Sequence, residues 1–477
     1  MLRRPTFRRL FSILWLLVAA LPAAHGAELT AFTHVTVIPM DGERVIEDQT
    51  VLVEGDKINA MGRTGTISIP DGTRQVNGTG KFLLPGLSDM HAHIGSRARS
   101  EDPGRDRALA QNQLLLYAAT GVTLLRDPAG SQAHFGYRER LRQGDWIGPD
   151  IFFTSPIHEG ANPVWDFSTK VTDPEAVEPL IAGYAQAGYQ GVKIYHTLSR
   201  SVYDAIVDSA RGHGLPVIGH VPFSVGIEYA LTSGQYSVEH LRGYDFDGVR
   251  PEALDIDGGR NAERFGSWMT MTDARMDELI EQTVATGTWN CPTLAVNRYL
   301  FDAEAREAIA RHPDFHLVHP ALRKRIVESE RLDAIFSPAS KAALRDALPR
   351  QQAFIARLDN AGGNLLIGTD SIVSAYIPGF TPIDEMLAFA DAGLSNYEVL
   401  RIATVSAAQS LGVADRMGTI NIGKQASLIL LDADPLSDLQ NLRSIHGVML
   451  RGRWLAASEL RARLESMADT WESNQRD

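Results

Sequence analysis

Cysteine is almost absent from this sequence. The 477 residues include a single cysteine, Cys291. One cysteine cannot form a disulfide within the chain, and it excludes a zinc cluster built from thiolates. Any metal site must therefore use histidine, carboxylate or lysine side chains, and we predict that Cys291 is a core residue.

Long apolar runs are scarce as well. The run from Phe11 to Ala20 is shorter than the roughly 20 residues that span a bilayer, which argues against a retained membrane anchor. Arginines precede this run and small residues follow it as far as Gly26, which is the layout of a secretory leader. We predict a signal peptide at residues 1–26 and a periplasmic or secreted mature protein. Arg8 and Arg9 leave a twin-arginine export signal open.

The sequence has fewer basic than acidic residues. The chain has 58 aspartates and glutamates against 46 lysines and arginines, which gives a formal net charge of -12. This balance argues against nucleic acid as a partner. With 44% hydrophobic and 22% charged residues, the composition is that of a globular protein that buries a large core.

Eight strand-like apolar runs alternate with helix-like stretches in the middle of the chain. They are Leu87–Ile94, Val122–Asp127, Asp150–Ser155, Gly191–His196, Pro216–Val221, Tyr236–Leu241, Thr288–Leu294 and Asn364–Asp370. This alternation is typical of βα units around a parallel sheet, and eight such units close a TIM barrel. We therefore predict an α/β fold with a (β/α)8 barrel over residues 86–412, which carries a helical insertion near residues 297–359.

Both ends of the chain consist of short β-like segments separated by turns. We predict that residues 27–85 and residues 413–477 together build a small composite β-sandwich domain. The second of these segments also includes a C-terminal helix or tail.

Polar side chains lie at the ends of several of the eight runs, at the edge where TIM barrels hold their reactive groups. Side chains alternate along a strand, so His91 and His93 share the inward face of the first run. By the same alternation Lys193 points inward from the fourth run. The other candidate metal ligands are His220, His240 and Asp370. Imidazole and carboxylate ligands without sulfur suit Zn²⁺ or a similar ion.

The sequence resembles the amidohydrolase superfamily over nearly the whole mature chain. The motif Leu84–His93 is similar to the first-strand motif of that superfamily, and the other matching segments are Gly121–Thr123, Gly191–Tyr195, Gly219–Pro222, Ser237–Leu241, Gly368–Asp370 and Gly418–Leu428. The chain looks most like the branch near imidazolonepropionase that includes lysine-carboxylated, prolidase-like Xaa-Pro dipeptidases. The resemblance implies two metal ions, which a carboxylated Lys193 bridges. Its implied ligands are His91, His93 and Asp370 for one ion, and His220 and His240 for the other.

The implied chemistry explains why these residue types are needed. A buried lysine beside a metal is pushed toward its neutral form and can add CO2, which yields a bridging carbamate. Two divalent ions, most simply Zn²⁺, roughly 3.5 to 4 Å apart can share a hydroxide and polarise a substrate carbonyl. Asp370 would take the proton of the attacking hydroxide and deliver it to the leaving amine. Tyr195 would donate a hydrogen bond to the developing oxyanion.

These expectations define an exported, binuclear, metal-dependent hydrolase. Its metal-bridging hydroxide would attack the amide or peptide-type C–N bond of a small-molecule substrate such as a dipeptide or an N-acyl amino acid. The sequence leaves open whether the protein forms a homo-oligomer. Glu239, the residue before His240, would orient a ligand from behind. We assign no metal to the remaining histidines, which we predict to be ordinary surface residues and which include His134, His158, His196, His312, His316 and His319.

Other reactions on the same site stay open. The prolidase-like branch commonly has a tyrosine two residues after its fifth-strand histidine, where this chain has Pro222. The alternatives are hydrolysis of a lactone, ester or phosphotriester, deamination or cyclic-amide hydrolysis at a single metal, and a non-catalytic role. A deaminase needs no Lys193 and has a glutamate shortly after the fifth strand, which this chain lacks. The presence of all six ligands argues for catalysis.

Overall fold

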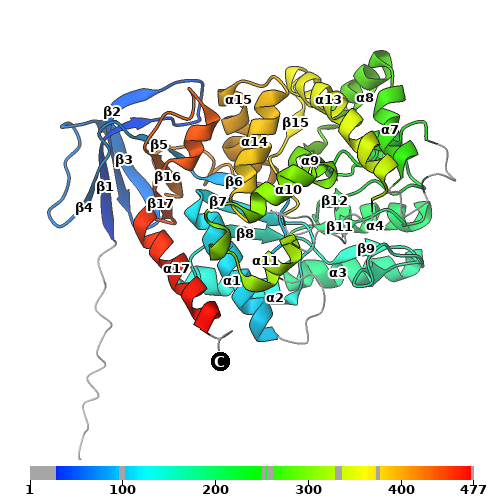
Figure 1. Cartoon of the computed structure of the whole chain (residues 1–477), viewed down its shortest axis with the longest axis horizontal. Coiled ribbons are helices and arrows are strands. Elements are labelled where there is room, and N and C mark those ends of the chain that lie inside the picture. Colours follow the sequence, from blue (N-terminus) through cyan, green and yellow to red (C-terminus); the bar gives the residue numbers. More distant parts are fainter. Residues whose placement is uncertain are drawn as a thin grey trace, which may run out of the picture.

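The computed structural model describes residues 28–95, 103–249, 254, 261–327, 336–371 and 377–473. The predicted signal peptide, residues 1–26, lies outside the described residues. Parallel strands and the helices around them make up most of the described chain, and a separate sheet built from strands of both chain ends lies beside them (Figure 1). Within these residues no helix combines the length and the apolar character needed to cross a membrane.

The central strands are all parallel, and they form two sheets. One has the order β6-β7-β8 and the other the order β10-β9-β11-β12-β13-β14-β15. Their bounds are β6 Leu87–Asp89, β7 Val122–Asp127, β8 Asp150–Phe153, β9 Ile157–Glu159, β10 Thr169–Lys170, β11 Val192–Ile194, β12 Val217–Gly219, β13 Ser237–Glu239, β14 Trp289–Cys291 and β15 Asn364–Leu365. Most of these residues are buried, as expected for parallel strands that helices cover. The α/β prediction is confirmed.

Backbone hydrogen bonds join the two sheets at both of their junctions. On one side, the amide of Met90 donates to the carbonyl of Ile367 at 2.8 Å, and Ala92 forms a parallel bridge with Ser371. On the other side, the amide of Ser155 donates to the carbonyl of Gly191 at 2.9 Å. The segments that follow the first and the last parallel strand therefore lie side by side, although they are far apart in the sequence.

The predicted runs are right in position, and all but Val122–Asp127, which coincides with β7, are longer than the strands they contain. Each of the eight contains one parallel strand, but β6 ends at Asp89 whereas the predicted run continued to Ile94. Beyond Asp89 the chain leaves the regular ladder, because the amide of Ala92 donates instead to the carbonyl of Arg126 at 3.1 Å. Sequence reasoning also missed β9, which pairs with β11 through Ile157 and Lys193.

Strands from both ends of the chain share a third sheet, which is separate from the two parallel ones. Its order is β18-β17-β16-β5-β1-β2-β3, and β4 pairs with β1. The bounds are β1 Leu29–Val37, β2 Ile46–Glu54, β3 Lys57–Arg63, β4 Arg74–Asn77, β5 Phe82–Pro85, β16 Leu428–Leu431, β17 Ile445–Leu450 and β18 Arg453–Ala456. The antiparallel pair β16 and β5 joins the two ends, and buried side chains such as Phe32, Leu430 and Trp454 give this sheet a core of its own.

Helices connect and cover the parallel strands. They are α1 Pro103–Ala119, α2 Gln132–Gln143, α3 Val177–Ala187, α4 Arg200–Gly212, α5 Ile227–Ser233, α7 Ala262–Thr270, α8 Asp273–Thr286, α9 Leu294–Phe301, α10 Ala303–Ala310, α11 Pro320–Val327, α13 Pro338–Asn360, α14 Thr381–Asp391, α15 Asn396–Arg401, α16 Ala407–Ser410 and α17 Ala457–Ser473. The segment near 297–359 is helical over most of its described residues, and α13 packs on α7 and α9. The C-terminal helix α17 packs against α1 (Figure 1).

Candidate functional site

The site begins where β6 ends. Asp89, the last residue of β6, is buried, and its carboxylate accepts hydrogen bonds from the amides of His91 and Thr369, both at 3.1 Å. The hydroxyl of Thr369 donates to the same carboxylate at 2.6 Å. Burial raises the pKa of Asp89 to about 7 despite these hydrogen bonds. Asp89 therefore holds the first histidine close to the segment that carries Asp370.

A glycine permits this close approach. A Cβ atom on Gly368 would lie 2.3 Å from Sγ of Cys291 and 2.8 Å from Cβ of His91, so no larger residue fits without a shift. Cys291 is buried in an apolar cluster, as predicted. Burial raises the pKa of its thiol well above the usual range.

His91, His93 and Asp370 form a group that could hold a metal ion, because one ligand atom from each lies within 4.8 Å of the others. Nε2 of His93 lies 2.9 Å from Oδ1 of Asp370, and Nε2 of His91 lies 3.5 Å from the same oxygen. All three residues are buried. Burial alone would raise the pKa of Asp370, but the neighbouring His240 and the hydrogen bond with His93 outweigh it and lower that pKa.

The other predicted ligands lie next to this group. The ring centroids of His91 and His240 are 4.4 Å apart, and those of His220 and His240 are 5.0 Å apart. Lys193 is 2% exposed. Burial is the largest cause of the lowered pKa values of His91, His220 and His240, and the positive charge of Lys193 lowers each of them further. Lys193 is therefore close enough to these histidines for its charge to lower their pKa values.

Each of the four histidines has its Nδ1 atom within hydrogen-bond distance of a partner. The partners are Glu239 for His91 at 2.5 Å, Asp127 for His93 at 3.1 Å, His196 for His220 at 2.7 Å and Thr293 for His240 at 2.6 Å. A partner on one ring nitrogen fixes the ring's orientation and leaves the other nitrogen for a metal. The Nε2 atom is thus the ligand atom that all four rings have available.

Glu239 supports His91 from behind, in the role that the sequence suggested. Its Oε1 accepts hydrogen bonds from Arg126 at 2.8 Å and from Ser237 at 2.6 Å, while its Oε2 contacts His91. Burial alone would raise the pKa of Glu239, but the charges of Arg126 and His91 outweigh it and lower that pKa. Glu239 is therefore an anion that three neighbouring groups hold in place.

Replacing Glu239 with glutamine is expected to weaken the binding of a metal ion at His91 by about 10- to 100-fold. Glutamine has no negative charge, and its amide group would face the three groups that the carboxylate now contacts. Metal titration against a chelator of known affinity measures the change. Glu139→Gln, which alters an exposed glutamate paired with Arg142, is the control. Equal metal affinity in E239Q and the unmodified protein would refute a supporting role.

Backbone strain gathers at the site. His240, Asp370 and Thr293 have φ values of 58°, 50° and 52°, in the left-handed region that residues other than glycine seldom adopt. Strain of this kind persists where the surrounding structure enforces it, and it is common at functional sites. Next to Thr293, the buried carboxylate of Glu385 accepts hydrogen bonds from the amides of Leu294 and Ala295 at the start of α9. This contact helps to enforce the Thr293 conformation.

Tyr195 lies against His220. Their ring centroids are 3.9 Å apart with an interplanar angle of 29°, so the two rings are stacked. The side chain of Tyr195 is half-buried. Tyr195 therefore borders the predicted ligands, and its predicted hydrogen bond to an oxyanion remains a prediction.

The expectation that the remaining histidines are surface residues is wrong for four of them. His134, His158, His196 and His319 are buried, whereas His312 and His316 are half-buried. They are buried because they pack against other segments of the chain: the ring centroids of His134 and Phe153 are 5.3 Å apart, and His158 contacts the backbone carbonyl of Lys193 at 2.9 Å.

Sequence reasoning also missed three of the groups that support the histidine ligands, namely Asp127, His196 and Thr293. Asp127 ends a predicted run, which was a usable signal. The other two contacts depend on how distant loops meet, and the sequence gives no sign of them.

The family model of the Amidohydrolase family matches residues 82–455. The chain is 22% identical over 432 residues to a 5-methylthioadenosine/S-adenosylhomocysteine deaminase of Caldanaerobacter subterraneus subsp. tengcongensis, a match that covers 84% of this chain and 83% of that protein. It is 33% identical over 100 residues to a protein of Nematostella vectensis named "Probable imidazolonepropionase", 21% of this chain and 22% of that protein. Among solved structures, an Xaa-Pro dipeptidase with bound methionine has a TM-score of 0.67 at 19% identity, and the match covers 90% of this chain and 100% of that one.

The family match extends over more than half of the chain and includes all of the parallel strands. This chain belongs to the Amidohydrolase family. It is accordingly a hydrolase that acts on carbon–nitrogen bonds. The family resemblance noted in the sequence is confirmed.

Proposed function

We propose that the chain is an exported, binuclear, metal-dependent amidohydrolase that cleaves an amide or peptide-type C–N bond of a small substrate. A dipeptide or an N-acyl amino acid is the favoured substrate type. The observation that carries this proposal is the cluster of buried, supported histidines beside Asp370 and Lys193. A signal peptide at residues 1–26 is part of the proposal.

The donor set fits two divalent metal ions. His91, His93 and Asp370 would hold one ion, and His220 and His240 would hold the other. Lys193, once carboxylated by CO2, would bridge them. The available atoms are imidazole nitrogens and oxygens, a set that suits Zn²⁺. The low pKa values of His91, His220 and His240 favour the neutral rings that bind metals.

The chain's own residues supply the rest of the chemistry. When bound, the metal ions lower the pKa of water and polarise the substrate carbonyl. Asp370, kept ionised by its histidine neighbours, would take a proton from the attacking water and pass it to the leaving amine. Tyr195, stacked against His220, would donate a hydrogen bond to the oxygen that gains charge.

The architecture proposed for this site is a (β/α)8 barrel over residues 86–412. The hydrogen bonds at both sheet junctions support its closure. The ligands then meet at the carboxyl ends of the strands, where barrel enzymes carry their active sites. The shared sheet of β1–β5 and β16–β18 supports a composite β domain from residues 27–85 and 413–477.

A substrate panel combined with elemental analysis tests the proposal. We expect two metal ions per chain and turnover of N-acyl amino acids or dipeptides that depends on metal, with activity lost on chelation and restored by Zn²⁺. Lactones, esters and phosphotriesters serve as the contrasting substrates. A metal-loaded protein that opens lactones or phosphotriesters and leaves all amides intact would overturn amide hydrolysis.

A deaminase is the second candidate, because a relative over most of the chain carries that name. It predicts one metal ion per chain and release of ammonia from 5-methylthioadenosine. The first glutamate after β12 is Glu228, which is exposed and pairs with Arg275, so it does not suit the proton transfer of a deaminase. Finding one ion together with ammonia release would favour this candidate over the first.

A further inference from the structure

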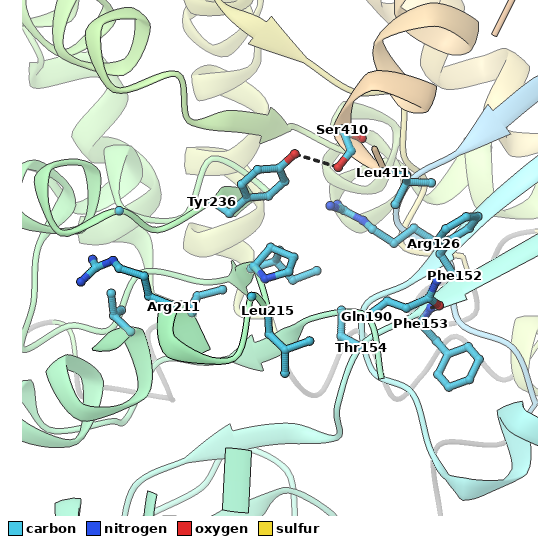
Figure 2. Close-up of a pocket in the computed structure, with 16 residues that line it drawn as sticks. Arg126, Phe152, Phe153, Thr154, Gln190, Arg211, Leu215, Tyr236, Ser410 and Leu411 are labelled. Carbon is cyan, nitrogen blue, oxygen red and sulfur yellow. Dashed lines mark hydrogen bonds between the residues drawn. The ribbon is translucent and has the colours of Figure 1, made fainter. Parts of the chain in front are cut away.

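A cavity of about 600 Å³ extends from the starts of β11, β12 and β13 to the ends of β7 and β8, where Arg126, Phe153 and Thr154 line it. Gln190, Pro216 and Tyr236, which line it, come just before β11, β12 and β13, whereas the histidines follow strand ends. None of the six predicted ligands lines it. Figure 2 shows the lining side chains around this space. The cavity is therefore separate from the candidate active site.

The interior of a parallel barrel is normally filled with side chains, so an open space of this size at the strand starts is unusual. Its volume lies within the range of cavities that bind small molecules. The lining residues Arg211 and Gly214 are exposed, so the cavity is accessible from solvent. A small ligand could enter without crossing the metal-binding residues.

The charged side chains of the lining are both cationic. Among its 16 residues there are two arginines, Arg126 and Arg211, and no aspartate or glutamate. Both arginines pair with carboxylates outside the lining: Arg211 with Asp208 at 2.9 Å, and Arg126 with Glu239 at 2.8 Å. An anionic group that enters the cavity therefore meets hydrogen-bond donors and no carboxylate of the lining.

Arg126 is the buried cation of the cavity. Its side chain is 5% exposed. Nε donates to the carbonyl of Met90 at 2.6 Å and Nη2 donates to Glu239 at 2.8 Å, while Nη1 has no hydrogen-bond partner in the part of the chain that is described. A buried guanidinium with a spare N–H group can make a strong, charge-assisted hydrogen bond to a carboxylate.

The remaining walls are largely apolar. Phe152, Leu215 and Leu411 contribute apolar side chains, and the ring of Tyr236 is fixed because its hydroxyl donates to the carbonyl of Ser410 at 2.7 Å (Figure 2). Such walls suit a flat or branched hydrocarbon group. One buried cationic group amid apolar walls matches a ligand with one anionic end and an apolar body.

We propose that this cavity binds a small carboxylate with an aromatic body, whose carboxylate accepts a hydrogen bond from Nη1 of Arg126. The same guanidinium holds Glu239, which in turn contacts His91. The ligand therefore has a direct physical connection to a candidate metal ligand through Arg126 and Glu239.

Isothermal titration calorimetry on the purified full-length protein tests this proposal with phenylacetate as the probe. 2-Phenylethanol, which has the same ring, no charge and no bond that the proposed activity would cleave, is the comparison ligand. We expect phenylacetate to bind at least about tenfold more tightly than 2-phenylethanol. Absence of phenylacetate binding, or equal affinity for the acid and the alcohol, overturns the proposal.

Variants assign the binding to the cavity. Leu411→Trp fills the cavity and is expected to weaken phenylacetate binding at least about tenfold, whereas Leu436→Trp, at a half-buried residue outside the lining, leaves it unchanged. Leu215→Trp fills the cavity from another wall and replaces Leu411→Trp if that variant does not fold. Unchanged binding in a folded cavity-filling variant places the probe elsewhere, for example at the metal ligands, and overturns the proposal.

Discussion

Replacing Lys193 with alanine is expected to remove at least one metal ion per chain and to lower kcat/KM for an amide substrate by about 10³-fold or more. Lys193 is almost fully buried and its charge acts on three of the histidines. Its backbone is fixed on both sides, because its amide donates to Ser155 at 3.1 Å and its carbonyl contacts His158 at 2.9 Å. The strand therefore stays in place when the side chain is removed.

The physical reason is the charge that the site must carry to hold two cations. A buried ammonium is costly, and beside metal ions it would repel them. Carboxylation turns this cation into an anion whose two oxygens could contact both metal ions. Alanine offers no ligand atom, so two ions would then repel each other without a bridging anion.

Elemental analysis, kcat/KM and a thermal melt of the same samples measure the effect. Lys170→Ala, which alters an exposed lysine of β10, is the matched control and should keep metals and activity. A Lys193→Ala protein that is folded and keeps two metal ions and full activity rules out the bridging role. Mass spectrometry under native conditions adds a direct readout, because carboxylation of Lys193 adds the mass of CO2.

Much of the parallel fold could be predicted from the sequence. Buried parallel strands require apolar residues on both faces, so runs such as Val122–Asp127 stand out from the helical stretches between them. The strand ends are harder to predict. Near the candidate site the backbone stops forming regular strand hydrogen bonds, as it does after Asp89. The pattern of apolar residues does not indicate where this happens.

The candidate ligands could be found because each side chain has a chemical character that a core position does not explain. Their supporting groups differ in this respect. Nothing in the sequence around Thr293 marks it as part of the site. Only its positive φ and its contact with His240 show that it belongs there. His196 resembles any histidine near a strand end until β11 and β12 come together and bring it to His220. Such contacts depend on tertiary structure, which no single segment encodes.

Replacing Asp370 with asparagine is expected to lower kcat by about 10³-fold while the chain keeps its fold. Asparagine tolerates the left-handed backbone conformation that Asp370 adopts at a φ of 50°, so the variant adds little backbone strain. It has nearly the same shape and keeps one oxygen as a ligand atom. It loses the negative charge and, with it, the ability to take up a proton.

Measuring both the metal occupancy and kcat of this variant distinguishes proton transfer from metal binding. If Asp370 transfers protons, D370N still has a low kcat after excess Zn²⁺ has restored full metal occupancy. If Asp370 only binds metal, kcat recovers once the metal sites are filled. Asp391→Asn, an exposed change at the end of α14, is the control for the loss of one acidic group. Full recovery of kcat in fully loaded D370N contradicts a proton-transfer role.

Because His93 and His91 lie 2.9 and 3.5 Å from the same carboxylate oxygen, a loss of metal affinity is expected alongside the loss of rate, and only measurements at saturating metal separate the two.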